Sequence, residues 1–181
     1  MFNISVTIEG KTPLLQNKLN PQDLFNKIRK KLTYEEEVKR ERVVKKAHIN
    51  SAGKLVQPAE TIRKSIELAS AYFPYKGQKM HKTLLQGNLA ITPELIEHKY
   101  QDWEVDESIV KDTTAKLVCR PRFDKWELDF FVACPLDSVE PSTLKDILEY
   151  AGNNVGLGSR RKSGYGKFRI IKWEIQKSLT K

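Results

Sequence analysis

The chain has 181 residues, which suits one domain with a substantial core, and its formal net charge of +9 favours a polyanionic partner such as nucleic acid. Its two cysteines lie in apolar runs without metal-site spacing, so we expect neither a metal nor a cofactor. The sequence has no run of membrane-spanning length and no signal-peptide pattern, so we expect a cytoplasmic protein without a membrane partner.

The first predicted strand covers residues 2–8, where apolar and polar residues alternate. Residues from about 14 to 50 are then interpreted as an insertion, because they are mostly polar. Within this insertion, apolar residues recur at helical spacing between Leu24 and Leu32 and predict a short helix.

The first core helix is predicted over residues 59–73, where apolar residues form one stripe. Residues 74–114 are interpreted as a second insertion. It contains a basic arm, a predicted strand over residues 84–91 and an acidic arm over residues 102–112.

The last third of the chain has the clearest pattern. Strands are predicted over residues 115–123 and 125–133, joined as an antiparallel hairpin, followed by a helix over 141–152 and a strand over 168–175. The order strand, helix, strand, strand, helix, strand is ferredoxin-like. We therefore expect an α+β fold with a four-stranded antiparallel sheet, as in the RNA-recognition motif, forming a single domain over residues 1–181.

A basic, glycine-rich loop is predicted between the last helix and the last strand. From Tyr150 to Trp173 the chain has no acidic residue and six basic ones. Glycine permits positive φ and close approach to a polyanion, and arginine adds bidentate phosphate contacts. The predicted nucleic-acid contacts in this loop are Gly156, Gly158, Ser159, Arg160, Arg161, Lys162, Ser163, Gly164, Tyr165, Gly166 and Lys167.

Two further arginines, Arg120 and Arg122, share one face of a predicted strand and are expected to extend this basic surface. Phe131 and Tyr165 are aromatic residues on which a base can stack, although burial in a second layer is the favoured interpretation for Phe131. The alternative interpretation is an ordinary tight turn with a basic surface. A phosphate-binding P-loop is excluded because this loop follows a helix and precedes a strand.

The loop pattern, Gly-Leu-Gly, five residues, then Gly-Tyr-Gly-Lys-Phe, resembles the C-terminal glycine-rich loop of the CRISPR-associated RAMP superfamily (repeat-associated mysterious proteins). Residues 56–66 also resemble the proline-led first helix of its backbone-type members, although Ala59 and Glu60 depart from the usual Pro-Gly-Ser-Ser-Leu-Lys-Gly form. The resemblance is closer to the backbone subunit, including relatives in phages and mobile elements, than to the repeat-processing nuclease. It implies RNA binding, and in some members RNA cleavage.

Metal-independent RNA cleavage in this superfamily usually uses a histidine, because its pKa lies near neutrality. The candidates are His48, His81 and His98, with His98 expected in a helix. For each we favour a solvated surface histidine, because no catalytic pair or triad is recognisable by spacing. Asp112 is an analogue of the loop aspartate with which some backbone subunits cleave, although a solvated acidic arm is the favoured interpretation.

We therefore predict a non-catalytic protein that binds RNA or single-stranded DNA, with a repeating homo-oligomer along the strand and ribonucleoprotein partners as further expectations. The second prediction is a metal-independent endoribonuclease that uses His48 or His81 and resembles the CRISPR repeat-processing enzyme. The third is a phage protein–protein adaptor whose basic loop contacts an acidic partner. RNA cleavage in the presence of a chelator separates the second prediction from the first.

Overall fold

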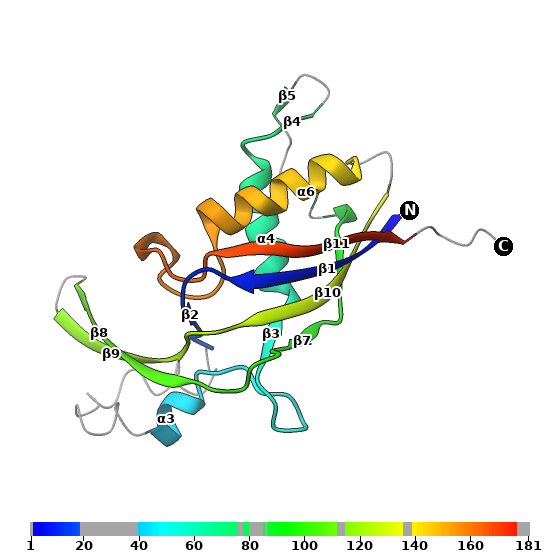
Figure 1. Cartoon of the computed structure of the whole chain (residues 1–181). Helices are drawn as coiled ribbons and strands as arrows, with labels where there is room; N and C mark the ends of the chain where they lie inside the picture. Colours follow the sequence, from blue (N-terminus) through cyan, green and yellow to red (C-terminus); the bar gives the residue numbers. More distant parts are fainter. Residues whose placement is uncertain are drawn as a thin grey trace.

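The computed structural model describes residues 2–18, 40–75, 78–79, 85, 87–111, 115–135 and 139–176. Its helices and strands (Figure 1) are β1 (Phe2–Gly10), β2 (Leu14–Leu15), α3 (Arg40–Val44), β3 (Val56–Pro58), α4 (Ala59–Ser70), β4 (Pro74–Tyr75), β5 (Gln78–Lys79), β6 (Ala90–Thr92), β7 (Leu95–Glu97), β8 (Glu104–Lys111), β9 (Ala115–Phe123), β10 (Glu127–Cys134), α6 (Pro141–Tyr150) and β11 (Phe168–Gln176). Two short turns between α6 and β11 are η1 (Ala151–Val155), which is π-helical, and η2 (Arg161–Ser163), which is 3-10 helical.

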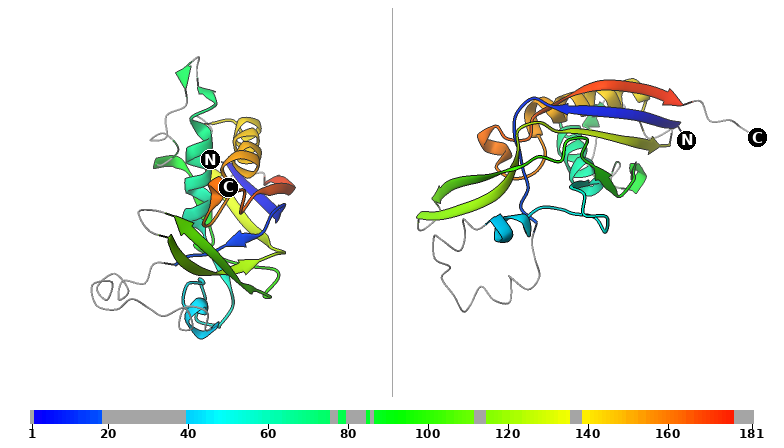
Figure 2. Two further views of the ribbon diagram at one scale, coloured as in Figure 1. Left: turned by 90° about the vertical axis from the view of Figure 1, so that its left-hand side faces the viewer. Right: turned by 60° about the horizontal axis from the view of Figure 1, so that its bottom comes forward.

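A four-stranded antiparallel sheet, called sheet A below, organises the fold. Its strand order is β11–β1–β10–β6, and all three pairings are antiparallel. Helices α4 and α6 lie against the same face of this sheet, as the views in Figures 1 and 2 agree. The predicted α+β class with a four-stranded antiparallel sheet is therefore confirmed.

The main core lies between sheet A and the two helices because the strands alternate. On β1 the side chains of Ile4 and Ile8 are fully buried, and the neighbouring Asn3 is exposed. On β10 the buried Leu128 alternates with the exposed Asp129 in the same way. This two-residue period sends every second side chain toward the helices. We call the opposite surface, away from α4 and α6, the helix-free face.

The helix predicted over residues 59–73 is confirmed but ends earlier, at Ser70. The N–H groups of Tyr72 and Phe73 still donate to Ala69 O and Ser70 O, as turns rather than helix. Pro74 follows, and a proline disfavours helical conformation in the residue before it.

Helix α6 confirms the helix predicted over residues 141–152, and its end packs closely on β11. A side-chain carbon at Gly152 would lie 2.4 Å from Phe168 O, so this close packing requires glycine. The helix widens into the π turn η1 at this point and ends at Gly156, where φ is +78°.

The predicted hairpin of strands 115–123 and 125–133 is wrong, because the two strands belong to different sheets. Strand β9 pairs with β2 and β8, and β10 pairs with β1 and β6. The chain passes between the sheets at Trp126, whose buried indole Nε1 donates to Thr12 O at 2.9 Å. Burial of this side chain at the connection directs β10 into sheet A, and β9 forms the projecting hairpin with β8 (Figure 2).

The predicted insertion over residues 74–114 contributes to both sheets. Its β6 is the fourth strand of sheet A, and the predicted acidic arm forms β8. The strand predicted over residues 84–91 is mostly wrong, since Leu89 N donates to Leu85 O at 2.9 Å in a helical turn and β6 begins at Ala90. The helix predicted between Leu24 and Leu32 lies outside the described residues.

Within the described ranges, no helix is both long enough and apolar enough to cross a membrane.

Candidate nucleic-acid interface

The glycine-rich loop, residues 156–167, is fixed by backbone hydrogen bonds at several points. Ser159 N donates to Leu15 O at 2.7 Å, which ties the loop to β2. Gly166 N donates to Pro13 O at 2.8 Å, and Leu157 N donates to Gly166 O at 2.9 Å, closing the base of the loop. These bonds hold the base of the loop through its backbone, and the buried side chain of Leu157 adds to the attachment.

Thr12 adds side-chain contacts to the same attachment. Its hydroxyl donates to Gly164 O at 2.8 Å and accepts a hydrogen bond from Lys167 N at 2.9 Å. The sequence analysis did not single out Thr12, because nothing in a local pattern indicates a partner 152 residues away. Lys11 N also donates to Lys167 O at 2.8 Å, so the turn after β1 and the end of the loop are bound together.

Most of the loop glycines are explained by packing within the protein. A side-chain carbon on Gly158 would lie 2.3 Å from Leu15 O, and one on Gly166 would lie 2.0 Å from Leu157 O. Gly156 is similarly confined by Gly166 O at 3.0 Å. Only at Gly164, where φ is +88°, does the added carbon meet no described atom within 4 Å. Gly164 is therefore the loop glycine best placed to approach a ligand.

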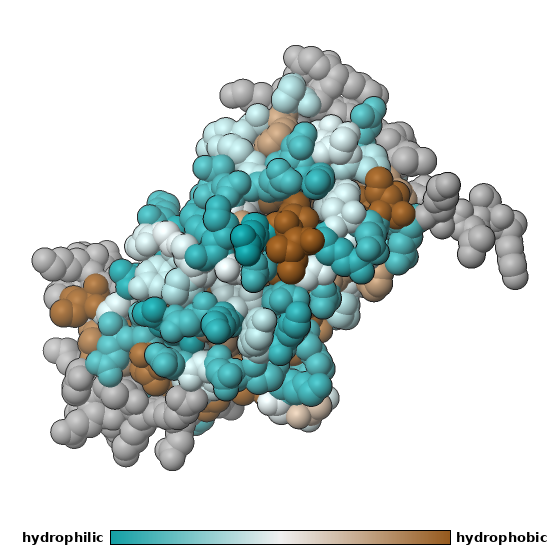
Figure 3. All heavy atoms as spheres, in the orientation of Figure 1, coloured by the Kyte–Doolittle hydropathy of each residue, from teal (hydrophilic) through white to brown (hydrophobic). Residues whose placement is uncertain are grey.

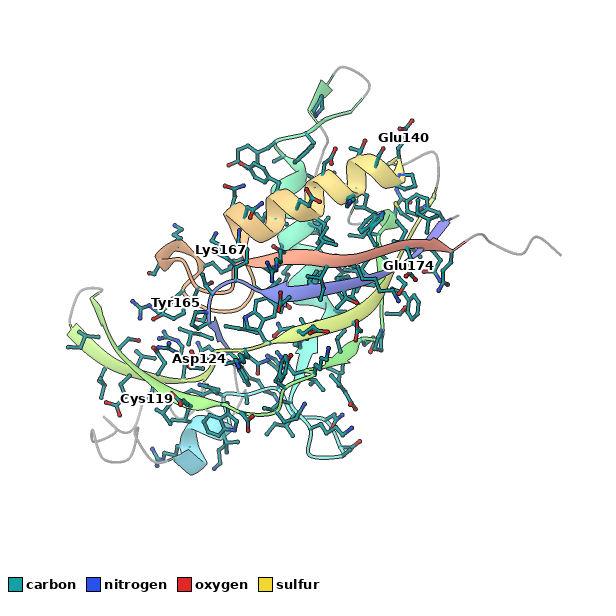
Figure 4. All side chains as sticks on the ribbon, viewed as in Figure 1. Cys119, Asp124, Glu140, Tyr165, Lys167 and Glu174 are labelled. Atoms are coloured by element: carbon teal, nitrogen blue, oxygen red, sulfur yellow. The ribbon has the colours of Figure 1, made fainter. Side chains whose placement is uncertain are left out.

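The side chains at the tip of the loop are held differently. Arg160 adopts a left-handed conformation with φ 54°, and its guanidinium carbon lies 5.3 Å from the centre of the Tyr165 ring. Both residues are half-buried. Lys162 and Ser163, in contrast, are exposed. Figure 4 shows Tyr165 and Lys167 at the end of sheet A where the loop approaches β9.

Positive charges crowd together around this loop. Burial, with the charge of Arg161, lowers the pKa of the Lys167 ammonium. Burial also lowers the pKa of Arg120, and the charge of Arg160 lowers it further. Cations that depress one another's pKa are stabilised when an anion binds between them. In the part of the chain that the structure describes, Arg160, Arg161, Lys162 and Lys167 form no ion pair.

The predicted extension through Arg120 and Arg122 is only partly realised. Arg120 lies near the loop, but its side chain is 7% exposed and donates to Ser108 Oγ at 3.2 Å. Its cross-strand neighbour is Asp106. Arg122 Nε lies 2.7 Å from Asp124 Oδ1, and this hydrogen bond raises the pKa of Arg122. Arg122 is therefore held by Asp124, and Arg120 is buried with a single described hydrogen bond to Ser108.

The helix-free face of sheet A carries several charges, but they are matched. Its ion pairs are Arg169–Glu9 at 2.6 Å, Lys172–Glu174 at 3.2 Å and Lys99–Glu127 at 2.6 Å. Asp129 accepts a hydrogen bond from Thr7, and Phe131 is 40% exposed. This face is mostly hydrophilic with isolated apolar side chains, as Figure 3 shows. Phe131 is therefore exposed rather than buried in a second layer, and the described cations around it are paired with carboxylates.

Two of the candidate histidines, His48 and His98, lie beside the buried Gln16, the residue after β2. Gln16 Oε1 accepts a hydrogen bond from the main-chain N–H of His48 at 2.8 Å, and Gln16 Nε2 lies 3.4 Å from His98 Nε2. His98 stacks on Phe123 with centroids 5.1 Å apart and is 3% exposed, so both a helical and a solvated position are wrong for it. Burial, with the nearby His48, lowers the pKa of His98 to about 4.

His48 itself is half-buried, and burial lowers its pKa, followed by the charge of Lys18. Its position beside Gln16 was missed by sequence reasoning because Gln16 and His98 are far from it in the chain. The other two catalytic candidates, His81 and Asp112, lie outside the described residues. Over the ranges described, no group of three or more histidines, cysteines and carboxylates is placed to hold a metal.

No family model matches the sequence, and no curated protein does. Among solved structures, the chain is similar to one in the cryo-EM structure of the Type III-B Cmr-beta bound to cognate target RNA, with a TM-score of 0.61 and 14% identity. The match covers 97% of this chain and 61% of that one, so the present chain spans less than two thirds of the similar chain. The chain therefore shares its fold with that chain of the Type III-B Cmr-beta structure.

Proposed function

We propose that the protein is a single RAMP-type domain over residues 1–181 that binds single-stranded RNA non-catalytically through its glycine-rich loop. The strand order β11–β1–β10–β6 supports a ferredoxin-like assignment. A ferredoxin-like domain has the series strand, helix, strand, strand, helix, strand, which β1, α4, β6, β10, α6 and β11 would form here. With the strands numbered in that series, their order across the sheet is fourth, first, third, second. In this assignment β6, rather than the predicted strand 115–123, is the second strand.

One observation carries the proposal: the loop presents, on a fixed backbone, cations that form no ion pair with any described residue. Arg161 and Lys162 lie in the 3-10 turn η2, between two positive-φ residues, Arg160 and Gly164. Because the backbone bonds to Leu15 and Pro13 fix this turn, binding does not have to order it. Arginine and lysine side chains that need no rearrangement suit the regularly spaced phosphates of a nucleic acid.

The loop is favoured over the helix-free face for a physical reason. Phosphate binding derives its free energy from neutralised charge and released counterions. On the helix-free face, Arg169 and Lys172 are already paired with carboxylates, so a phosphate would have to displace Glu9 or Glu174. The proposal therefore departs from the RNA-recognition motif, which binds on its open sheet face.

The likeness to a chain of an RNA-bound complex adds to the case for RNA and for ribonucleoprotein partners. We propose that the protein acts as a subunit along a strand, although the same basic loop suits single-stranded DNA as well. Paired titrations with RNA and DNA of one sequence distinguish the two ligands.

The test is a fluorescence-anisotropy titration of labelled single-stranded RNA at several salt concentrations. Replacing Arg160, Arg161 and Lys162 together with alanine should weaken binding and lower the salt slope, by roughly 0.7 for each phosphate that the variant no longer neutralises. Gly164→Val should lower affinity with the slope partly retained, because it removes no charge but strains a backbone with φ +88°. Equal affinity of the folded triple variant and the wild type contradicts the proposal.

One observation keeps the nuclease as a second candidate. A lowered pKa holds His48 neutral near pH 7, which is the form that accepts a proton from a 2′-hydroxyl. If the wild type cuts RNA at a defined site in the presence of a chelator, and His48→Ala does not, the protein is an enzyme.

An adaptor that contacts only an acidic protein would instead show no salt-dependent retention on RNA.

A further inference from the structure

An aromatic pair lies on the surface at the C-terminal ends of α4 and α6. Tyr72, in the turn after α4, is 69% exposed. Its ring packs on that of Tyr150, the last residue of α6, with centroids 5.0 Å apart and an interplanar angle of 31°. Phe73 meets Tyr150 edge-on at 5.7 Å and fixes it from another direction. The Tyr72 ring is therefore supported by protein on one side and open to solvent on the rest of its surface.

This pair is continuous with the basic loop through the turn η1. Asn154 Nδ2 donates to Tyr150 O at 3.2 Å, one turn further along the helix. Lys167 Nζ in turn donates to Asn154 O at 2.6 Å. Since Lys167 is the last residue of the loop, described hydrogen bonds connect the end of the loop through η1 to Tyr150.

The charge around the pair differs from that of the loop. Lys11 Nζ donates to Asn153 Oδ1 at 3.0 Å at the η1 end. Beyond it, α6 exposes Asp146 and Glu149, and Glu149 lies 3.9 Å from Lys145. The excess of positive charge thus ends at η1. An uncharged, flat group suits the tyrosine better than a further phosphate.

We propose that Tyr72, supported by Tyr150, stacks on a base of the single-stranded nucleic acid whose phosphates contact the loop. The strand then runs from Arg161 over Lys167 and η1 to the ends of the two helices. A single strand is required, because a duplex does not present its base faces, and stacking of this kind tolerates any base. This inference rests on the proposed function and extends its footprint to a second element of the fold.

Leu68 provides a matched control for Tyr72. It lies one helical turn earlier on α4 and is 42% exposed, but it has no ring to stack on a base. If this surface merely excludes water, loss of either the Tyr72 or the Leu68 side chain should raise the Kd for RNA. If Tyr72 stacks on a base, only loss of its ring should raise the Kd, so Tyr72→Phe, which keeps the ring, is a second control.

The experiment measures the Kd of the full chain for oligouridylates of about five and about fifteen nucleotides, which lie near the lower and upper ends of the usual site size for single strands. Tyr72→Ala is expected to raise the Kd for the long RNA about tenfold and to leave that for the short RNA nearly unchanged. Tyr72→Phe and Leu68→Ala should bind both as the wild type does. The salt slope should also stay constant, because the protein keeps all its charges. An oligothymidylate of the longer length distinguishes DNA from RNA as the source of the base.

A second readout locates the base directly. With 5-iodouridine in the long RNA, ultraviolet crosslinking should attach the RNA to the peptide that contains Tyr72, and Leu68→Ala should not alter this. If Tyr72→Ala binds the long RNA as tightly as the wild type while the triple loop variant does not, the stacking inference is wrong and the proposed function stands. If the wild type binds neither RNA nor DNA, both are wrong.

Discussion

The glycine-rich loop and the helix-free face of sheet A carry the same kinds of charged side chains, but they arrange them in opposite ways. On the helix-free face, each cation described lies within 3.2 Å of a carboxylate, as Arg169 does with Glu9 and Lys172 with Glu174. In the loop, Arg161 and Lys162 protrude from a turn that has no acidic neighbour in the sequence. The two regions therefore differ in how their basic residues are paired rather than in the kind of residue they carry, and this difference is the basis of the proposed interface.

The two regions also differ in what fixes them. Strand pairing fixes the helix-free face along its whole length, and each of its side chains alternates with a core residue. The base of the loop is fixed mainly by backbone bonds to residues 11–15 and by the burial of Leu157, whereas residues 161–163 at its tip make no described bond to another element. Binding at the loop should therefore depend on a few backbone positions as well as on its charges.

The largest effect is expected from a glycine at the base of the loop. Gly166→Ala places a carbon 2.0 Å from Leu157 O at a φ of +72°, and overpacking with backbone strain should cost about 4 kcal/mol of unfolding free energy. Gly164→Ala, in open space, should cost only about 1 kcal/mol. Urea unfolding of the two variants measures the difference. Equal costs would mean that the loop is not held by its base.

The second effect tests charge pairing directly. The triple loop variant lacks three cations that form no ion pair within the described part of the chain. If each phosphate contact contributes roughly 1 kcal/mol, the Kd of this variant for RNA should rise on the order of 100-fold. A matched triple variant with Lys99, Arg169 and Lys172 changed to alanine has the same net charge. Because those cations are paired, its Kd should rise only about twofold. Equal increases in the two variants would show that net charge alone controls binding.

The third prediction uses pH to change the stability of the fold while the charge of the loop stays constant. His98 titrates near 6.5 when unfolded and at about 4 when folded, so the unfolded chain binds more protons between these values. The contribution of neutral His98 to the unfolding free energy is therefore fully present above pH 6.5. The unfolding free energy should fall by about 2 kcal/mol as the pH is lowered to about 5. The loop arginines stay charged throughout, so any decrease of affinity in acid reports on the scaffold.

His98→Phe is the control for this pH dependence. It keeps a ring against Phe123 and removes the titrating group, so urea midpoints should change less between neutral and mildly acidic buffer than in the wild type. A wild-type curve that is flat over this range would contradict burial of a neutral imidazole.

The smallest effect is expected on the β9 strand. Arg122→Ala should change the Kd for RNA less than about twofold, because Asp124 already holds the guanidinium at 2.7 Å. Removing Asp124 instead, with Asp124→Ala, should free the arginine and strengthen binding slightly. The reverse order of effects, measured in the same titration, would place Arg122 in the interface.

Local sequence patterns correctly predicted the helices and strands whose apolar residues recur at the period of the element. They failed where a contact distant in the sequence decides which strands pair. Strand β1 and helices α4 and α6 were predictable because their apolar residues recur at the period of the element. The assignment of β9 and β10 to different sheets depends on the buried indole of Trp126 and its bond to Thr12, 114 residues away. No window of the sequence contains that contact.

The candidate site shows the same division. The basic, glycine-rich composition of the loop located it, since the motif is continuous in the chain. The sequence did not reveal that Gly158 and Gly166 serve internal packing, or that Arg120 is buried beside Ser108. It also gave no sign that Gln16 joins His48 to His98, because the three residues come from separate segments.

The backbone attachment of the loop has a consequence for protein engineering. Because Ser159 N and Gly166 N bond to main-chain oxygens of Leu15 and Pro13, the base of the loop is fixed without the side chains of residues 161–163. The tip at residues 161–163 can then be treated as an interchangeable cassette, randomised in a selection library while Gly158 and Gly166 are kept. Variants drawn from such a library would differ in the ligand they capture while sharing one scaffold.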